Sequence, residues 1–239
     1  MSEWAIEIEG LTKSFGHHFA LKGVDLKVGK GEFLTIFGPN GAGKTTLIRI
    51  LSTLTKSTSG NLRVAGFSPD EGEELRRRIG VISHQTFLYN NLTAYENIKF
   101  YGRMYDVDNL EQRVEEVIEE VGLTSRMHEL VRTFSRGMQQ RLSIARSLVH
   151  HPTVLFLDEP YTGLDQHAAR IFNNLLEGLH TGERAIIMTT HDLSRGLEIG
   201  DCVAILVSGK IVYHEEIEKV KRETFEKTYF AYVDEEREK

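Results

Sequence analysis

Apolar and polar residues alternate in two segments near the start of the chain. Residues 5–9 are Ala-Ile-Glu-Ile-Glu, and the segment from Phe19 to Val28 repeats the alternation. This period is expected of strands that bury one face, so we predict antiparallel strands here. The next segment, residues 32–37, is instead an almost continuous apolar run that stops at Gly38-Pro39. Such a run is typical of a strand buried on both faces.

Helical and strand patterns alternate along the rest of the chain. After the buried run, apolar residues from Leu47 to Leu54 recur at helical spacing, and the middle third carries three helical segments, at 93–105, at 110–121 and after Ser135. Further strands are predicted at 61–64, 79–83, 153–157, 184–189, 202–207 and 210–213, and further helices at 71–78, 166–180 and 193–199. This order predicts an α/β fold: a parallel sheet covered on both faces, an N-terminal antiparallel β part and a helical insertion near 86–150.

The composition favours a soluble globular protein. Of its 239 residues 40% are hydrophobic and 27% charged, which fits one large domain or two small ones. The longest apolar runs, such as 203–207, are far shorter than the roughly 20 residues of a membrane-spanning helix. Residues 1–7 lack the basic and apolar parts of a signal peptide, so we expect no secretion. The single cysteine, Cys202, excludes an internal disulfide, and we expect it to be a small buried hydrophobe.

Acidic charge is concentrated at the C-terminal end of the chain. The net charge is −6, and residues 214–239 carry nine acids and six bases. The remaining 213 residues are therefore close to neutral, without the basic bias of a nucleic-acid-binding domain, and we expect no nucleic-acid partner. Residues 214–239 are predicted to form a charged C-terminal helix or tail.

A glycine-rich loop follows the buried run and precedes a helix. Gly38-Pro-Asn-Gly-Ala-Gly-Lys-Thr45 has the spacing of a phosphate-binding loop, whose backbone N–H groups surround a phosphate at a helix N-terminus. In this pattern Lys44 reaches the β- and γ-phosphates and the Thr45 hydroxyl ligates Mg²⁺. The predicted nucleotide-binding residues are Phe15, Gly38, Pro39, Asn40, Gly41, Ala42, Gly43, Lys44, Thr45 and Thr46. The alternative is a glycine-rich turn that binds nothing.

Two carboxylates end another apolar strand. Residues 153–157 are followed by Asp158 and Glu159, which places both acids at the carboxyl edge of a parallel sheet, where such sheets bind ligands. We predict that Asp158 holds Mg²⁺ and that Glu159 polarises the attacking water. Without the phosphate-binding loop, the same pair would more often be a solvated cap.

Further motifs resemble the nucleotide-binding subunits of ATP-binding cassette (ABC) transporters, over about Trp4 to Tyr213. Phe134-Ser-Arg-Gly-Met-Gln-Gln-Arg141 is similar to the family's signature motif, usually written Leu-Ser-Gly-Gly-Gln. The resemblance implies that Ser135 and Gly137 contact the γ-phosphate of ATP held by another protomer. The signature positions are Ser135, Arg136, Gly137, Met138 and Gln139. Arg136 stands where the family usually has glycine, so its side chain must turn away from the phosphate.

Four other positions match the family's pattern. Gln85 is similar to the glutamine that senses Mg²⁺ and the water, and Asp165 lies in a segment similar to the loop that touches the partner in the dimer. His191 resembles the switch histidine, which implies contact with the γ-phosphate and orientation of Glu159. Phe15 lies where the family places an aromatic ring that stacks on adenine. Glu159, His191 and Gln85 are thus the predicted catalytic residues, and Thr45, Gln85 and Asp158 the predicted metal ligands.

The resemblance implies an ATPase subunit with ATP and Mg²⁺ as cofactors. Residues 1–213 would form one ATPase domain with a helical subdomain at about 86–150, and the chain would form a homodimer or pair with a second ATPase subunit around two ATP molecules. A separate transmembrane permease would dock on residues 85–105 and hold the subunit at the cytoplasmic face of the membrane. Met138, where the family usually has glutamine, favours the exporter branch, with drug, lipid or haem-type cargo. The signature segment 134–141 and the short tail after Tyr213 together favour the haem exporter of cytochrome c maturation. The alternatives are a soluble ABC ATPase acting on DNA or ribosomes and a small-molecule kinase.

Overall fold

The computed structural model describes residues 3–83, 85–180 and 182–237, and it centres on a six-stranded sheet. The strand order is β5-β6-β7-β3-β8-β9, parallel from β5 to β8, with β9 antiparallel at the edge. The strands are β3 (Phe33–Phe37), β5 (Ile79–Ser83), β6 (Val154–Asp158), β7 (Ala185–Thr190), β8 (Cys202–Val207) and β9 (Lys210–Glu216). Every residue of β3, β6 and β7 is buried, as their continuous apolar runs predict.

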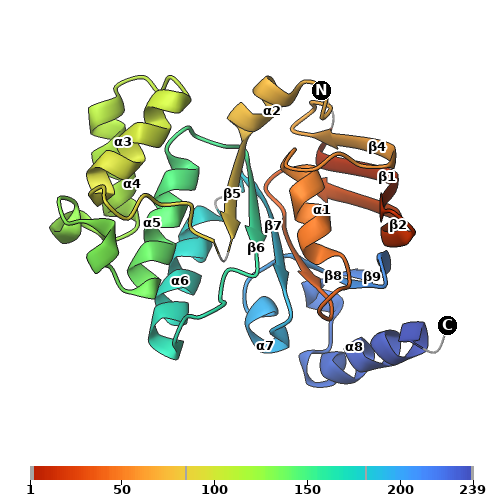
Figure 1. Cartoon of the computed structure of the whole chain (residues 1–239). Helices are drawn as coiled ribbons and strands as arrows, with labels where there is room; N and C mark the ends of the chain where they lie inside the picture. The colour runs from red at the N-terminus through yellow and green to blue at the C-terminus, as the bar shows by residue number, and fades with distance from the viewer. Residues whose placement is uncertain (1–2, 84, 181, 238–239) are drawn as a thin grey trace.

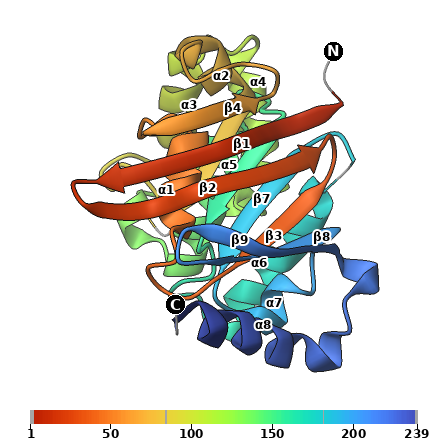
Figure 2. The same ribbon diagram turned by 90° about the vertical axis from the view of Figure 1, so that its right-hand side faces the viewer.

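A second, antiparallel sheet lies across one face of the first (Figure 2). It has the order β2-β1-β4, with β1 (Trp4–Phe15), β2 (His18–Gly29) and β4 (Ser59–Val64). β1 is longer than predicted, because a bulge between Ile8 and Leu11 lets the strand continue past Gly10 with its apolar face still buried. The inner face of this sheet shares one hydrophobic core with the main sheet and with helix α1 (Lys44–Leu51).

The helical part covers the opposite face of the main sheet (Figure 1). It consists of α3 (Ala94–Met104), α4 (Leu110–Glu120), α5 (Arg136–Leu148) and α6 (Gln166–Leu179), with 3₁₀ turns at Thr124–Arg126 and Val131–Thr133. Thr93 caps α3 through a reciprocal pair with Glu96: the Thr93 hydroxyl accepts from the Glu96 N–H, and the Glu96 carboxylate accepts from the Thr93 N–H. The apolar stripes of these helices and the β5–β6–β7 side of the sheet form a second core.

The bounds of three short helices can be compared with the prediction: two are shorter than predicted and one is close to it. α1 ends at Leu51 rather than near Leu54, because Thr53 adopts a left-handed conformation and leaves the Leu54 side chain 63% exposed. α7 is limited to Leu193–Gly196, and α2 spans Gly72–Arg78, close to prediction. No described helix is long and apolar enough to cross a membrane.

The C-terminal segment packs on the sheet. After a 3₁₀ turn at Ile217–Lys219, α8 (Arg222–Arg237) places Phe225, Tyr229 and Val233 against the face of β8 that points away from the antiparallel sheet. The rings of Phe225 and Phe37 lie 5.3 Å apart, centre to centre. Residues Arg222–Arg237 therefore form a docked helix with an apolar side, whereas residues 214–216 belong to β9.

One partly buried histidine makes the stability of the fold dependent on pH. His150 stacks on Tyr105 with ring centres 3.9 Å apart, and its Nε2 lies 2.9 Å from the Ile79 carbonyl oxygen. Burial lowers the pKa of His150 from 6.5 to about 4. The unfolded chain therefore takes up a proton before the folded protein does, so stability present above about pH 6.5 is lost as the pH falls toward about 4.

We expect His150→Phe to remove this pH dependence, since phenylalanine keeps the ring and does not titrate. Between about pH 7.5 and about pH 5, the wild-type free energy of unfolding should fall by about 2 kcal/mol more than that of the variant. Urea unfolding of both proteins at the two pH values measures the difference. Parallel pH profiles would show that His150 is protonated equally easily in both states.

Candidate active site

The candidate site lies where β3, β6 and β7 reach the carboxyl edge of the main sheet. β3 ends at Phe37, and residues 38–43 form a loop that leads into α1. Gly41 and Gly43 have left-handed backbones, with φ of 82° and 109°. A Cβ on Gly43 would lie 2.6 Å from the Ala20 carbonyl oxygen, so only glycine fits this close approach of the loop to β2.

The loop surrounds an open space suited to phosphate. A cavity of about 340 Å³ lies over it. Its lining consists of Phe15, His18, Ala20, Pro39, Asn40, Gly41, Ala42, Gly43, Lys44, Thr45, Thr46 and Glu159. The N–H groups of Lys44, Thr45 and Thr46 begin α1 and donate to no backbone carbonyl among the described residues, so they are available to an anion at the positive end of the helix. A larger cavity, about 800 Å³, lies between the two sheets and contains none of the predicted catalytic residues.

Lys44 is held inside the loop. Its ammonium donates to the carbonyl oxygens of Gly38 at 2.6 Å and Pro39 at 3.2 Å, and lies 3.2 Å from Glu159 Oε1. The side chain is only 6% exposed. The Lys44 ammonium is therefore held in place to bind a phosphate group. A bound phosphate would compete with the Glu159 carboxylate for this ammonium.

Asp158 ends β6 and is bridged to the loop. Its Oδ1 accepts from the Thr45 hydroxyl at 3.1 Å and from the Thr189 hydroxyl at 2.8 Å, and the residue is 4% exposed. The register places Asp158 beside Thr189 of β7. A carboxylate and a hydroxyl beside a phosphate site are ligands that suit Mg²⁺, so these residues fit the ion. The sequence did not single out Thr189, which reads as an ordinary β-branched residue of a buried strand.

Glu159 and His191 face each other across the site. His191 Nδ1 lies 2.8 Å from Glu159 Oε2, while Glu159 Oε1 faces Lys44 and has no hydrogen-bond partner among the described residues. Glu159 adopts a left-handed backbone with φ of 49°, and its N–H donates to the Thr189 carbonyl oxygen. For a residue other than glycine this costs on the order of 1 kcal/mol or more, and it turns the carboxylate into the cavity. An ionised carboxylate held between two nitrogen groups is suited to accept a proton from water.

Phe15 lies beside the loop, whereas Gln85 makes no hydrogen bond with Asp158 among the described residues. The Phe15 ring is 55% exposed, lines the cavity and lies 4.8 Å from Lys13 Nζ. The backbone of Gln85 exchanges two hydrogen bonds with the Ser83 hydroxyl, but its side chain is exposed and has no hydrogen-bond partner among the described residues. The structure thus brings the predicted catalytic residues Glu159 and His191 into contact. Within the part of the chain that it describes, it shows no hydrogen bond between Gln85 and either of them.

The signature residues lie outside this cavity, at the start of α5. The Ser135 hydroxyl accepts from the Met138 N–H and caps the helix, and Gln139 Nε2 lies 3.5 Å from the Phe134 carbonyl oxygen. Arg136 is exposed, and a Cβ on Gly163 would lie 3.7 Å from its Nε, so the side chain follows the neighbouring loop.

The residues next to the signature pack it against α6. A Cβ on Gly137 would lie 2.9 Å from the Ala168 side chain, so α5 and α6 approach closely here. Asp165 caps α6 by accepting from the Ala168 N–H at 2.7 Å. Neither the signature nor Asp165 lines the phosphate cavity of its own chain.

Comparison with known proteins agrees with this geometry. The ABC transporter family matches residues 21–162. The ABC transporter ATP-binding protein YdbJ of Bacillus subtilis is 40% identical over 213 residues, which is 88% of this chain and 69% of that protein. The daunorubicin resistance ATP-binding protein DrrA3 of Streptomyces coeruleorubidus is 34% identical over 94% of this chain and 72% of its own length. A dimeric ATP-binding cassette bound to ADP and phosphate superimposes with a TM-score of 0.79 and 28% identity, over 89% of this chain and 98% of that one. The chain belongs to the ABC transporter family, as one of its ATP-hydrolysing, ATP-binding subunits.

Proposed function

We propose that two ABC cassettes, this chain and a second copy or a related subunit, close head to tail around two ATP molecules and drive a separate membrane subunit. The observation that carries the proposal is that Lys44 and Glu159 line one cavity, with His191 in contact with Glu159, and that the signature residues do not line this cavity. A second cassette would supply its own signature to complete the site. The related cassette bound to ADP and phosphate is itself a dimer.

Polar side chains in and beside the cavity have separate roles in this proposal. Lys44 and the free N–H groups of α1 bind the β- and γ-phosphates, and Thr45 and Asp158 hold Mg²⁺, which neutralises phosphate charge when it is bound. Glu159 accepts a proton from the attacking water, and His191 orients Glu159 and reaches the γ-phosphate. Gln85 would join the metal site as a further ligand, since its side chain is exposed and has no hydrogen-bond partner among the described residues.

Phe15 is proposed as the platform for adenine. Stacking on an aromatic ring contributes about 1–3 kcal/mol per base, so Phe15→Ala should weaken ATP binding by roughly 5- to 150-fold. The same variant should bind inorganic triphosphate as tightly as wild type, since the phosphate contacts remain. Calorimetric titration with both ligands tests this, with Phe19→Ala, another exposed aromatic outside the cavity lining, as the matched control. Equal weakening for both ligands would contradict a role in base stacking.

An exposed aromatic cluster supports the predicted docking surface at residues 85–105. Phe87, Tyr89, Phe100 and Met104 are between 40% and 62% exposed, and the rings of Tyr89 and Phe100 lie 5.1 Å apart. Exposed apolar side chains gathered in this way mark protein–protein contact sites. We propose that this aromatic cluster receives the membrane subunit.

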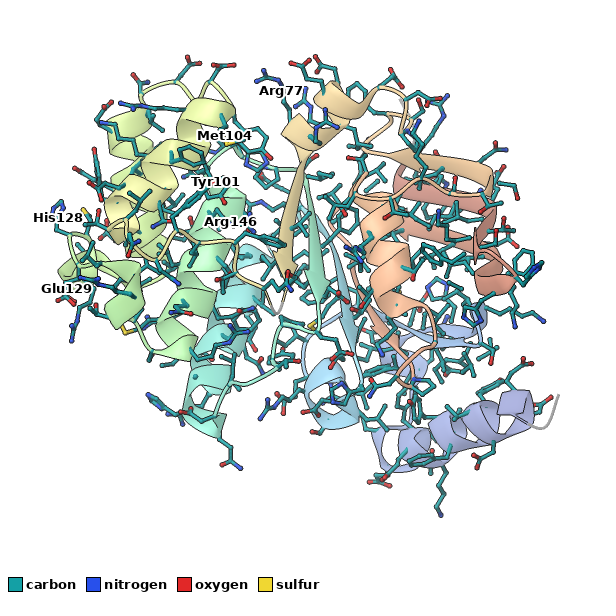
Figure 3. The ribbon with its side chains drawn as sticks, viewed as in Figure 1. Arg77, Tyr101, Met104, His128, Glu129 and Arg146 are labelled. Atoms are coloured by element: carbon teal, nitrogen blue, oxygen red, sulfur yellow. The ribbon has the colours of Figure 1, made fainter. Side chains whose placement is uncertain are left out.

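Arg146 of α5 links the aromatic cluster to the helix that carries the signature. Its guanidinium lies 5.2 Å from the Tyr101 ring and 5.7 Å from the Phe87 ring, and it donates to the Val81 carbonyl oxygen at 2.6 Å. Figure 3 shows Arg146 and Tyr101 pointing toward one another on this side of the molecule. A partner that shifts the aromatic rings would therefore bias the position of α5.

We propose that the transporter is an exporter of drug-type molecules. The name of DrrA3 connects that relative with daunorubicin resistance, which favours drug-type export over the haem-type cargo toward which the sequence leaned. An ATPase acting on DNA or ribosomes is not favoured, since the relatives described above are transporter subunits and the chain has no basic bias. The cytoplasmic face of the membrane would be the site of action, through the permease.

Weakening the aromatic cluster should separate membrane coupling from ATP chemistry. We expect Phe87→Ser with Phe100→Ser to lose most of the membrane subunit that co-purifies with the tagged chain from detergent-solubilised membranes, while basal ATP hydrolysis stays within about 2-fold of wild type, since surface changes are well tolerated. Phe230→Ser, which alters an equally exposed ring on α8, is the matched control. Recovery of ribosomal or DNA-repair proteins in place of a membrane protein would overturn the transport role.

A further inference from the structure

A carboxylate, a thiol and an imidazole meet far from the nucleotide site. Glu32 immediately precedes β3, Cys202 begins β8 and His214 lies within β9. Ligand atoms of the three side chains all lie within 4.8 Å of one another. Neither the phosphate chemistry nor the proposed dimer uses any of these residues.

The sheet register explains why the three side chains meet. Leu34 pairs with Cys202 across β3 and β8, and Glu32 is two residues before Leu34, so Glu32 and Cys202 share a face of the sheet. His214 pairs with Ala204, two residues after Cys202, and is therefore on that face as well. β8, β9 and the residue just before β3 thus each direct one metal-ligand atom toward the same point between the two sheets.

The surroundings favour a cation. A cavity of about 570 Å³ opens beside these residues and gives an ion a path from solvent. Its acidic lining residues are Glu9, Asp25, Glu32, Glu215 and Glu216, against a single lysine, Lys27. A cleft lined mainly by carboxylates concentrates cations.

The ligand atoms of the three side chains indicate which metal ion the site would bind. Thiolate sulfur, imidazole nitrogen and carboxylate oxygen together are ligands of Zn²⁺, whereas Mg²⁺ and Ca²⁺ prefer oxygen alone. Glu32 Oε2 accepts from the Gly29 N–H at 2.7 Å, which orients the carboxylate as an outer-shell contact orients a metal ligand. The His214 ring has no hydrogen-bond partner among the described residues, so its nitrogens are free to bind.

We propose that Glu32, Cys202 and His214 bind a Zn²⁺ ion, with water as the fourth ligand. Binding converts the Cys202 thiol to a thiolate and releases its proton to the solvent, with no oxidation or reduction. The ion would tie the edge strand β9 to the start of β3 across β8. This is the end of β3 away from the phosphate-binding loop, roughly 16 Å along the strand, so the zinc site is separate from the Mg²⁺–ATP site.

Cobalt is the probe for this site. Cys202 is the only cysteine of the chain, so a thiolate-to-cobalt charge-transfer band on titrating the full protein with Co²⁺ reports this site and no other. We expect the band in wild type, its loss in Cys202→Ser, and its removal when Zn²⁺ is added, since Zn²⁺ binds such sites more tightly than Co²⁺. A wild-type protein without the band would overturn the proposal.

Two further variants distinguish a three-ligand site from a lone reactive thiol. Affinity for Zn²⁺ should fall in His214→Gln and Glu32→Gln by more than the roughly 10- to 100-fold that loss of an outer-shell contact costs. Glutamine at position 32 keeps an oxygen for the Gly29 N–H, and His214 is exposed, so both variants should fold. His128→Gln, an exposed histidine elsewhere, is the control. Unchanged affinity in both ligand variants would refute the site, as would a melting temperature that Zn²⁺ raises equally in wild type and Cys202→Ser.

Discussion

Glu159→Gln is expected to lower the rate of ATP hydrolysis by roughly 10²- to 10⁴-fold, the contribution of a positioned general base, while ATP still binds. Glutamine has the size of glutamate and still accepts a hydrogen bond, but it cannot take a proton from water. The change also removes the carboxylate that lies 3.2 Å from Lys44 Nζ and competes with phosphate for it. ATP should therefore bind at least as tightly as in wild type, and the variant should accumulate as a closed dimer.

Phosphate release and light scattering with Mg²⁺–ATP measure the two effects of Glu159→Gln. The matched control is Glu177→Gln, which makes the same chemical change at an exposed position on α6 and should behave as wild type. Wild-type turnover in Glu159→Gln would remove Glu159 from its role as the base. A variant that neither turns over nor binds ATP would show instead that the left-handed turn at Glu159 had collapsed.

The parts of the site that lie on buried strands were predictable from sequence. The apolar runs predicted strands at 32–37 and 153–157, and the structure has β3 at Phe33–Phe37 and β6 at Val154–Asp158. Strands of this kind are fixed by local hydrophobicity and by the glycine or acid that ends them. The approach of the phosphate-binding loop to Asp158 then follows from the carboxyl edge that parallel strands share.

What the sequence did not show depends on contacts between distant segments. Thr189 donates a hydrogen bond to Asp158 because β7 pairs with β6 in the sheet. A threonine in a buried strand gives no sequence signal of that role. Cys202, predicted to be buried, is partly exposed and lines a cavity together with Glu32 and His214, residues that are distant from it in the sequence. Gln85 was expected at the metal by resemblance; its side chain has no hydrogen-bond partner among the described residues, so this role stays a prediction.

The ion pair between Lys44 and Glu159 connects binding to catalysis. Glu159 Oε1 lies 3.2 Å from Lys44 Nζ, and both residues line the same cavity. Phosphate oxygens that take over Lys44 leave Glu159 bonded to His191 alone, with Oε1 free to face a water molecule. In the proposed mechanism, Glu159 would thus be free to act as the base only when phosphate has replaced it at Lys44.

Lys44→Met should accordingly weaken ATP binding and abolish ATP hydrolysis. A charge-assisted hydrogen bond is worth about 1.5–3 kcal/mol, so loss of the ammonium should weaken ATP binding by roughly 10- to 150-fold and reduce hydrolysis to background. Methionine matches the length of the buried stem, and Glu159 keeps its contact with His191, so the free energy of unfolding should change by less than about 2 kcal/mol. Fluorescent-nucleotide titration, phosphate release and urea unfolding measure the three quantities. Lys227→Met on the exposed side of α8 controls for loss of a charge, and Lys44→Met with wild-type affinity would show that the backbone N–H groups alone hold the nucleotide.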